Sequence, residues 1–212
     1  MNLRDPAEDL RYLLARGYQR SSAVRFVGDR YNLAKQERLY LYRCVYPEST
    51  ASLHSKKCVP PDCVKGTSVS IDGFNVLRTV NGALRGAPVF VCDDGFVRDI
   101  SVGLKRPSVE ELIESLEIVT SVVAELRPAG VTFVYDRPVS RSGMISKRTG
   151  EMMGEKGIRG SSLTSLHPDT EVLSLGEVVA TSDSVVIQRA KLVFDLAGYI
   201  IMDRLCIRPT KI

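Results

Sequence analysis

The chain has 212 residues, of which 44% are hydrophobic and 25% are charged, a globular composition that excludes disordered and fibrous proteins. Five cysteines are an odd number for a disulfide scaffold, and no signal peptide or long apolar run is evident, so we expect a cytoplasmic protein without a membrane partner. The net charge of +4 is unevenly distributed along the chain. Residues 1–65 hold twelve Lys and Arg against seven Asp and Glu, whereas the rest is nearly neutral.

Residues 1–46 are predicted to form a small all-helical module. Three short helical patterns joined by tight turns resemble a helix-turn-helix bundle. Arginines and tyrosines alternate along the module, which favours RNA binding, with Arg25 and Arg30 as candidate phosphate contacts. The alternative is that the tyrosines belong to the core and the arginines form a solvated face.

Residues 47–66 contain three prolines and small polar residues, which is typical of a linker. This segment and the helix before it hold four residues of the types that bind zinc: Cys44, His54, Cys58 and Cys63. There is no second closely spaced cysteine pair, and reduced cytoplasmic cysteines explain the pattern equally well. Both interpretations stay open.

From residue 67 to residue 212, short β-branched runs alternate with helical patterns. Strands are predicted at 67–71, 88–92, 131–135, 161–166, 177–181 and 192–194, with helices at 75–84, 108–126, 144–156, 184–190 and up to 205. Strands that alternate with helices form parallel sheets covered by helices on both faces. The predicted fold class is therefore α/β, with a parallel-sheet, three-layer domain at 67–212 preceded by the helical module.

Four of the predicted strands end in aspartates, namely Asp72, Asp93 with Asp94, Asp136, and Asp183. In an open parallel sheet the carboxyl ends of the strands meet at one crevice. Clustered carboxylates repel one another unless a cation neutralises them, and oxygen ligands suit Mg²⁺ or Mn²⁺. We therefore predict a metal site that hydrolyses phosphodiester bonds. The alternative is that each aspartate only caps a helix.

Polar residues beside these aspartates suggest further roles. Asn75 is expected to orient water or touch phosphate, and Ser182 either binds phosphate or begins a helix. Residues 137–160 carry six basic residues against two acidic ones and several glycines. They predict a mobile basic arm that holds a phosphate backbone through Arg137, Arg141, Lys147 and Arg148. A charge-rich surface loop is the alternative.

The run Ile-Asp-Gly-Phe-Asn-Val-Leu at 71–77, followed by Val-Ala-Thr-Ser-Asp at 179–183, resembles the PIN-like nucleases, particularly the NYN branch, over about residues 67–205. The resemblance implies an Mg²⁺- or Mn²⁺-dependent ribonuclease fold whose metal-binding acids match Asp72, Asp136 and Asp183. A further acid of that family, on a helix after the first strand, has no matching residue here. Its expected substitutes are Asp93, Asp94 or Asp99.

Nearly the whole chain is also similar to an uncharacterised, largely archaeal family that pairs a small N-terminal domain of unknown function with a PIN-like one. The similarity rests on Arg-Gly-Tyr near the N-terminus, Asp-Asp-Gly-Phe-Val-Arg-Asp at 93–99 and Asp-Arg-Pro-Val-Ser-Arg-Ser-Gly at 136–143. It implies the same two-part organisation and carries no known activity.

The leading prediction is a metal-dependent nuclease with RNA as its substrate. The alternative is a non-catalytic RNA-binding or scaffold protein, which would bind RNA without turnover. A phosphatase of the haloacid-dehalogenase type is disfavoured, because Phe74 occupies the position of its second acid. A Rossmann nucleotide binder is disfavoured because no glycine-rich loop follows the first strand. A homodimer stays open.

Overall fold

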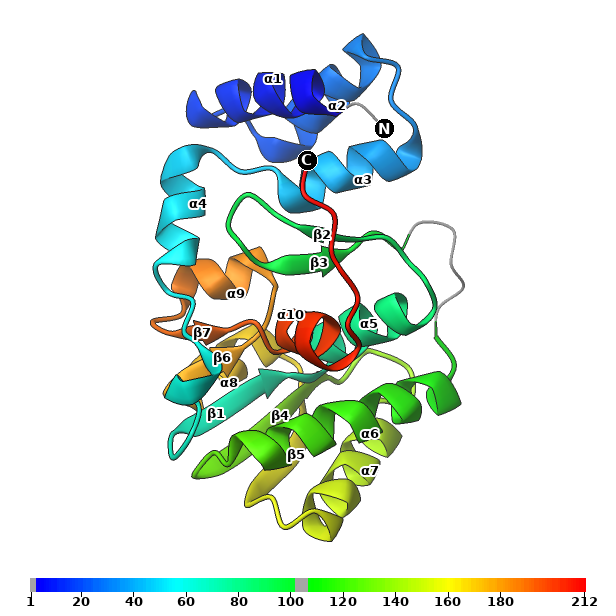
Figure 1. The fold of residues 1–212 in the computed structure, drawn as a ribbon, viewed down its shortest axis with the longest axis vertical. Coiled ribbons are helices and arrows are strands. Elements are labelled where there is room, and N and C mark those ends of the chain that lie inside the picture. Colours follow the sequence, from blue (N-terminus) through cyan, green and yellow to red (C-terminus); the bar gives the residue numbers. More distant parts are fainter. Residues whose placement is uncertain (1–2, 102–106) are drawn as a thin grey trace.

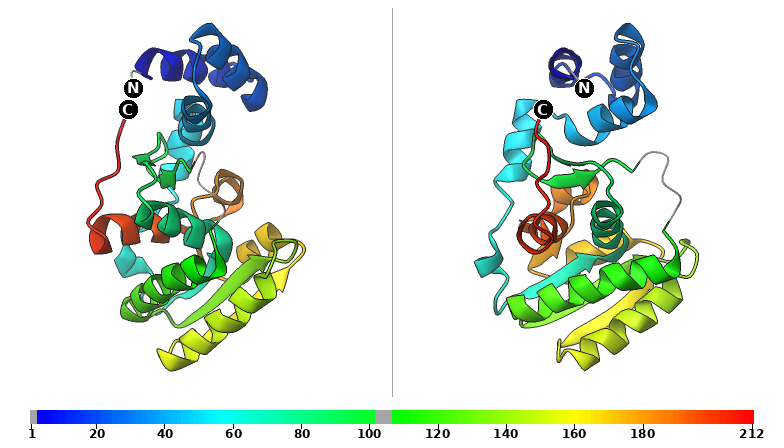
Figure 2. Two further views of the ribbon diagram at one scale, coloured as in Figure 1. Left: turned by 90° about the vertical axis from the view of Figure 1, so that its right-hand side faces the viewer. Right: turned by 45° about the vertical axis from the view of Figure 1, so that its right-hand side comes forward.

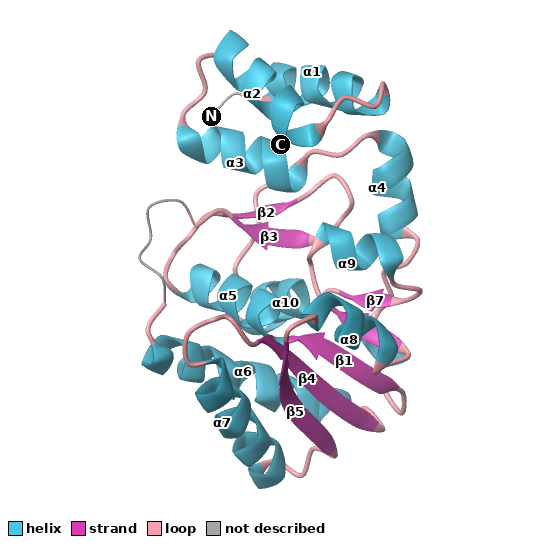
Figure 3. Cartoon of the chain, turned by 180° about the vertical axis from the view of Figure 1, so that it is seen from behind, coloured by secondary structure: helices cyan, strands magenta, loops and turns pink. Residues whose placement is uncertain are grey.

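The computed structural model describes residues 3–101 and 107–212. Four helices form the N-terminal part of the described chain, followed by a two-stranded antiparallel sheet and a five-stranded parallel sheet (Figure 1). Helices cover both faces of the parallel sheet, with α8 and α9 on the side seen in Figure 3. The predicted α/β class with a helical N-terminal module is confirmed. No described helix is long and apolar enough to cross a membrane.

The N-terminal helices are α1 (Arg4–Ala15), α2 (Arg20–Arg30), α3 (Lys35–Cys44) and α4 (Glu48–Ser55), followed by the 3-10 turn η1 (Pro61–Cys63). The parallel sheet contains β1 (Ser68–Asp72), β4 (Gly130–Asp136), β5 (Gly160–Ser165), β6 (Val178–Ala180) and β7 (Val193–Phe194), and the antiparallel sheet contains β2 (Val89–Val91) and β3 (Val97–Asp99). The other described helices are α5 (Gly73–Leu84), α6 (Val109–Leu126), α7 (Ser142–Glu155), α8 (Pro168–Ser174), α9 (Ser184–Arg189) and α10 (Leu196–Tyr199), which continues as the π-helical turn η2 (Ile200–Arg204).

Strand β1 lies at the centre of the parallel sheet, whose strand order is β5-β4-β1-β6-β7. Ser70 is in register with Thr132 of β4 on one side and with Val179 of β6 on the other. The chain thus extends the sheet from β1 through β4 to β5 and then crosses to β6 on the other side. In doubly wound sheets, ligands bind outside the carboxyl ends of the strands at the point where the order reverses. Here that point adjoins the end of β1.

Alternate residues of the central strands face two different cores. In β4, Phe133 and Tyr135 pack with residues of α5, α6, α7 and α10, whereas Val134 packs with residues of α8 and α9. This period of two arises because successive side chains of a strand point to opposite faces. Figure 2 shows α6 and α7 side by side on the first of these faces.

The strand predicted at 88–92 does not join the parallel sheet. Its residues form β2, which pairs with β3 in an antiparallel hairpin with Val89 opposite Asp99. A turn with Gly95 at φ +85° connects the two strands. The hairpin lies between the N-terminal helices and the parallel sheet, and the C-terminal segment runs along it through Thr210 (Figures 1 and 2). The parallel-sheet interpretation of this strand is therefore wrong.

The segment 47–66, predicted as a linker, contains helix α4. This helix begins after Pro47, whose backbone is extended, and buries the side chain of His54. Helices α1 to α3 share a core with the hairpin, in which the ring of Tyr40 meets the edge of Phe90 at 4.9 Å between centroids. The N-terminal module therefore has four described helices rather than three, and it packs directly on the hairpin.

The predicted mobile arm at 137–160 is mostly the helix α7. One side of this helix is buried against the sheet through Ile145, Thr149, Met152 and Met153. Residues at this spacing fall on a single face of a helix. Gly143, Gly150 and Gly154 lie within this helix. Of the basic residues in the segment, Lys147 and Arg148 lie on α7, whereas Arg137, Arg141, Lys156 and Arg159 flank it.

Candidate functional site

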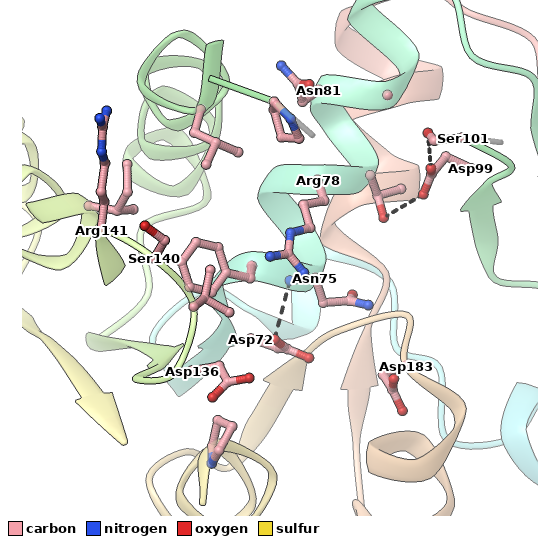
Figure 4. A pocket seen from close by; sticks show the side chains of 18 of the residues that line it. Asp72, Asn75, Arg78, Asn81, Asp99, Ser101, Asp136, Ser140, Arg141 and Asp183 are labelled. Atoms are coloured by element: carbon pink, nitrogen blue, oxygen red, sulfur yellow. Dashed lines mark hydrogen bonds between the residues drawn. The ribbon is translucent and has the colours of Figure 1, made fainter. Parts of the chain in front are cut away.

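A cleft of about 1160 Å³ opens at the carboxyl edge of the parallel sheet, beside the end of β1. Residues of α5, α6, α7 and α8 line it, together with the loops that follow β4 and β6 (Figure 4). Five aspartates line the cleft: Asp99 of β3, and Asp72, Asp136, Asp169 and Asp183, which we call the four cleft aspartates. The structure thus brings the predicted residues Asp72, Asp136 and Asp183 to one cleft and adds a fourth acid.

Asp72 ends β1 and caps α5. Its Oδ1 accepts a hydrogen bond from the backbone N–H of Asn75 at 3.4 Å. The next residue must be glycine, because a Cβ at Gly73 would lie 2.2 Å from the ring of Tyr135. The hydroxyl of Tyr135 is in turn held by Thr149 at 2.8 Å. The close approach of the β1–α5 turn to β4 therefore fixes the Asp72 carboxyl at the cleft.

The carboxyl of Asp72 is poorly compensated. Its pKa is raised to about 7, mainly by burial and also by the charges of Asp183 and Asp169, against the lowering effect of hydrogen bonds from Thr181 and from the backbone of Asn75. Desolvation disfavours the charged form of an acid, and nearby like charges add to the effect. An acid in this state gains stability from any cation that enters the cleft.

Asn75 is held in a defined orientation by residues that follow β6. Its Oδ1 accepts hydrogen bonds from the backbone N–H of Ser182 at 2.8 Å and from the Ser182 hydroxyl at 3.1 Å. Thr181 donates to Asp72 Oδ2 at 3.0 Å and also lies 3.3 Å from Asn75 Oδ1. A backbone N–H can only donate, so the amide oxygen faces Ser182 and the NH₂ group is the donor that Asn75 offers to the cleft.

Ser182 itself does not line the cleft. Its side chain is 1% exposed, and its hydroxyl is used to hold Asn75. The predicted direct contact of Ser182 with phosphate or water therefore finds no support in the geometry, and Ser182 acts on the cleft only by positioning Asn75.

Asp183 combines the two interpretations that the sequence allowed. Its Oδ1 caps α9 by accepting from the backbone N–H groups of Val185 at 2.7 Å and Val186 at 3.4 Å. The same residue is exposed at the cleft. Asp136, at the end of β4, has no side-chain hydrogen bond or ion pair with another residue of the described chain. Capping a helix and lining the cleft are thus compatible roles.

Asp169 is a cleft residue that sequence reasoning missed. It lies in the first turn of α8, directly after Pro168, and is exposed. The signal that was available is a proline followed by an acid shortly after a predicted strand, which favours a helix start at the carboxyl edge of the sheet. Asp169 thus joins the three predicted acids at the cleft, whereas Asp93 and Asp94 are not among its lining residues.

The four cleft aspartates offer the type of ligand that Mg²⁺ and Mn²⁺ prefer, carboxylate oxygen. None of them forms an ion pair with a Lys or Arg within residues 3–101 and 107–212. In the same residues, no three Asp, Glu, His or Cys side chains are already grouped closely enough to hold an ion. Carboxylate oxygens without a cationic partner suit hard divalent ions. The residue types at the cleft therefore fit such an ion, although their side chains are not yet close enough together to coordinate one.

Asp94 lies away from the cleft, in a fully buried ion pair. Arg98 contacts both of its carboxylate oxygens at 2.8 Å, and His54 of α4 lies 3.0 Å from Oδ2. Burial alone would raise the pKa of Asp94, but the hydrogen bonds from His54 and Arg98 outweigh it and leave the pKa below its ordinary value. The Nε of Arg98 donates to the backbone oxygen of Ser182 at 2.8 Å. This network joins the helical module to the residue that holds Asn75.

Asp93 also joins the helical module to the hairpin and does not line the cleft. The guanidinium of Arg11 in α1 donates to both of its oxygens at 2.7 Å, and the backbone N–H of Tyr46 donates at 2.9 Å. Asp93 and Asp94 thus have cationic partners from the protein itself, which removes the need for an ion.

Asp99 does line the cleft, but it is committed to protein partners. It accepts hydrogen bonds from Ser101 and, at 3.4 Å, from Thr79 of α5. Arg43 of α3 donates to its backbone oxygen at 2.8 Å and lies 3.4 Å from its carboxylate. Asp99 therefore fixes an arginine of the helical module in the cleft wall. Arg43 is one of the arginines expected to give the helical module phosphate affinity, but the sequence did not place it at the cleft.

The basic residues predicted after β4 are dispersed. Arg141 lines the cleft and is exposed, whereas Arg137, Lys147 and Arg148 are not among the lining residues. Arg148 pairs along α7 with Glu151 at 3.2 Å and with Glu155 at 3.0 Å. Further arginines at the cleft come from α5: Arg78, which lies over the ring of Phe74 at 5.0 Å, and Arg85, which pairs with Glu111 at 3.2 Å.

The basic residues predicted in the helical module lie on α2, away from the cleft. Arg25 is exposed. Arg30 is exposed too, pairs with Asp9 at 3.5 Å and lies over the ring of Tyr31. Their proposed contact with RNA stays a prediction.

The four candidate zinc ligands do not meet. Cys44 is buried in α3, whereas Cys58 and Cys63 are exposed. His54 is buried between Asp94 and Gln188, with which it makes its two ring-nitrogen contacts. The zinc interpretation is therefore not supported by the described residues.

Comparison with known proteins connects this chain to two families of unknown function. The domain of unknown function DUF5616 matches residues 61–199. The chain belongs to the DUF5616 family. Its residues 2–57 match the protein of unknown function DUF434. Over 199 residues it is 32% identical to an uncharacterised protein of Methanocaldococcus jannaschii, covering 92% of this chain and 95% of that one. No solved structure matches it.

The DUF5616 match contains all four cleft aspartates, from Asp72 to Asp183, and the DUF434 match contains α1 to α4. The cleft is therefore built from both parts, since Arg43 of the DUF434 segment reaches its wall. The ion pair of Asp93 and the buried ion pair of Asp94 lie where the two parts meet.

Proposed function

We propose that this DUF5616 protein is a divalent-metal-dependent nuclease that hydrolyses phosphodiester bonds in RNA, with a PIN-like fold of the NYN type. The observation that carries the proposal is the group of four aspartates, from three strand ends and the start of α8, that line one cleft without a cationic partner in the described chain. Unneutralised acids at the carboxyl edge of a parallel sheet favour a cation-dependent site.

In this proposal Asp72, Asp136, Asp169 and Asp183 hold Mg²⁺ or Mn²⁺. When bound, the ion neutralises these carboxylates, activates water and stabilises the charge that develops on phosphate. The NH₂ group of Asn75, fixed by Ser182, donates a hydrogen bond to a phosphate oxygen. Asp72 keeps its position through Thr181 and the turn at Gly73.

The size and charge of the cleft support a polymeric anion as substrate. Its volume of about 1160 Å³ exceeds the ~300–1,000 Å³ of usual small-molecule sites. Arg43, Arg78 and Arg141 line it beside the aspartates. Arginines bind phosphate through their planar fork of donors. An RNA strand that passes from these arginines to the four cleft aspartates would bring one of its phosphodiester groups to the acids.

The test is cleavage of labelled single-stranded RNA with Mn²⁺ or with EDTA. We expect wild type and Asp203→Asn to cleave only with Mn²⁺, because Asp203 is exposed and lies outside the cleft. Asp72→Asn keeps the shape of the side chain and removes its charge, so it should lose cleavage. Equal cleavage by wild type and Asp72→Asn would refute the proposed site.

A second candidate function is RNA binding without catalysis. The observation that favours it is the absence, in the described residues, of three carboxylates already grouped for an ion. The same assay separates the two functions. Salt-sensitive RNA binding by wild type with no Mn²⁺-dependent turnover would favour the non-catalytic protein.

A further inference from the structure

Arg43 is the point at which the helical module enters the cleft. It lies in the last turn of α3, and its side chain, 30% exposed, reaches the cleft wall opposite the parallel sheet. Among residues 3–101 and 107–212, its contacts run through Nη1, which donates to the backbone oxygen of Asp99 at 2.8 Å and lies 3.4 Å from its carboxylate. A guanidinium has five N–H donors. Within the described chain, the donors of Nε and Nη2 have no acceptor.

We infer that Arg43 binds a phosphate of the RNA strand next to the one that is cleaved, so that the DUF434 segment supplies part of the substrate site; this inference rests on the proposed function. Asp99, Thr79 and Ser101 form the support that holds the guanidinium at the wall. Because the arginine is anchored through one nitrogen, its remaining donors are presented to the cleft at little further cost in side-chain entropy.

The charge of the cleft wall favours an anion here. Asp99 is buried and offsets one positive charge, while Arg78 and the exposed Arg141 line the same cleft. Arg43 enters the cleft from α3, whereas the four cleft aspartates lie at or after the ends of β1, β4 and β6 and on α8. In this inference the two groups contact different phosphates of one RNA strand.

The experiment measures the binding of a short labelled single-stranded RNA to the full chain in EDTA, so that turnover plays no part. Arg43→Gln leaves Asp99 without its cation and risks the fold. We therefore compare the single variant Asp99→Asn with the double variant that carries both Asp99→Asn and Arg43→Gln. Neither variant leaves a buried carboxylate without a cation at position 99. Thermal unfolding of both variants checks that they fold. Arg16→Gln is the matched control, because Arg16 is exposed on the same module and lies outside the cleft.

We expect the double variant to bind RNA about tenfold more weakly than Asp99→Asn, a difference of ~1.4 kcal/mol. The slope of log affinity against log salt should fall by ~0.7, the value for one lost phosphate contact on a single strand. Arg43→Lys should keep the slope and lose part of the affinity, and Arg16→Gln should match wild type. Equal affinity and slope for the double variant and Asp99→Asn, or no RNA binding by wild type, would overturn the inference.

The outcome is separable from that of the nuclease assay. A normal Arg43 effect with no Mn²⁺-dependent cleavage would refute the nuclease and leave the phosphate contact standing. Cleavage that depends on Asp72, with no Arg43 effect on binding, would refute the contact and leave the nuclease standing.

Discussion

The aspartates of this protein fall into two groups with opposite surroundings. Asp93, Asp94 and Asp99 lie at or near the hairpin, and each is paired with an arginine: Arg11, Arg98 and Arg43. The four cleft aspartates, at the end of the parallel sheet, have no such partner in the described chain. The same residue type therefore joins the two modules in one region and forms an uncompensated acidic surface in the other.

The difference shows that the position of an aspartate after a strand does not determine its role. A buried carboxylate with an arginine keeps its charge, because the ion pair and its hydrogen bonds offset the cost of desolvation. A carboxylate beside other carboxylates is destabilised until a cation arrives. Asp94 and Asp72 differ accordingly: the pKa of Asp94 lies below its ordinary value and that of Asp72 is raised to about 7.

The largest effect is expected in the paired group, for Asp94→Ala. This change leaves the charge of Arg98 buried without a partner and removes the contact with His54, so it should cost ~3–5 kcal/mol of unfolding free energy. Denaturation with urea measures the loss. The control Asp203→Ala alters an exposed aspartate and should change stability by less than ~0.5 kcal/mol. Similar losses in the two variants would show that the buried network does not hold the modules together.

In the cleft, by contrast, removal of an aspartate charge is expected to increase the free energy of unfolding, and Asp72→Asn in EDTA tests this. The native state binds the Asp72 proton more tightly than the unfolded chain, so wild-type stability should fall as the pH rises from about 4 to about 7. The amide mimics the protonated acid. Asp72→Asn should therefore match wild type near pH 4 and exceed it above pH 7 by less than ~4 kcal/mol. Urea denaturation across this range checks the prediction, and a constant difference between the variants would contradict it.

A smaller effect is expected for Arg11→Gln, which breaks the paired contact at Asp93. Arg11 is 36% exposed and Asp93 is 18% exposed, so solvent screens much of the interaction. Two parallel hydrogen bonds make the pair stronger than a usual surface ion pair, and we expect a loss of ~1 kcal/mol. Denaturation in low and high salt tests this, because the difference from wild type should shrink as salt is added.

The sequence was sufficient to predict those cleft residues whose positions follow directly from the geometry of a parallel sheet. Asp72 and Asp136 end strands that neighbour each other in the same direction, so their meeting follows from the sheet geometry. The order of the strands was not predictable in this way. It depends on which β-branched runs pair, which is decided by contacts between residues far apart in the chain.

The hairpin was mistaken for a parallel strand because its local pattern is the same, an apolar run followed by acids. The Asp94-Gly95 pair between two apolar runs is a turn signal that favours a hairpin. The pairing of Asp93 with Arg11 could not be predicted from the local sequence, because the two residues are 82 positions apart. Arg98 lies only four residues from Asp94, so that pair was within reach of local reasoning.

The most direct measurement is a calorimetric titration of the metal-free chain with Mn²⁺ above pH 7, for wild type, Asp72→Asn and Asp203→Asn. If the unpaired aspartates of the cleft form an ion site, wild type and Asp203→Asn should bind the ion with the same affinity, and Asp72→Asn should show no saturable binding. Undiminished binding by Asp72→Asn, or none by wild type, would contradict the assignment of this cleft as a metal site.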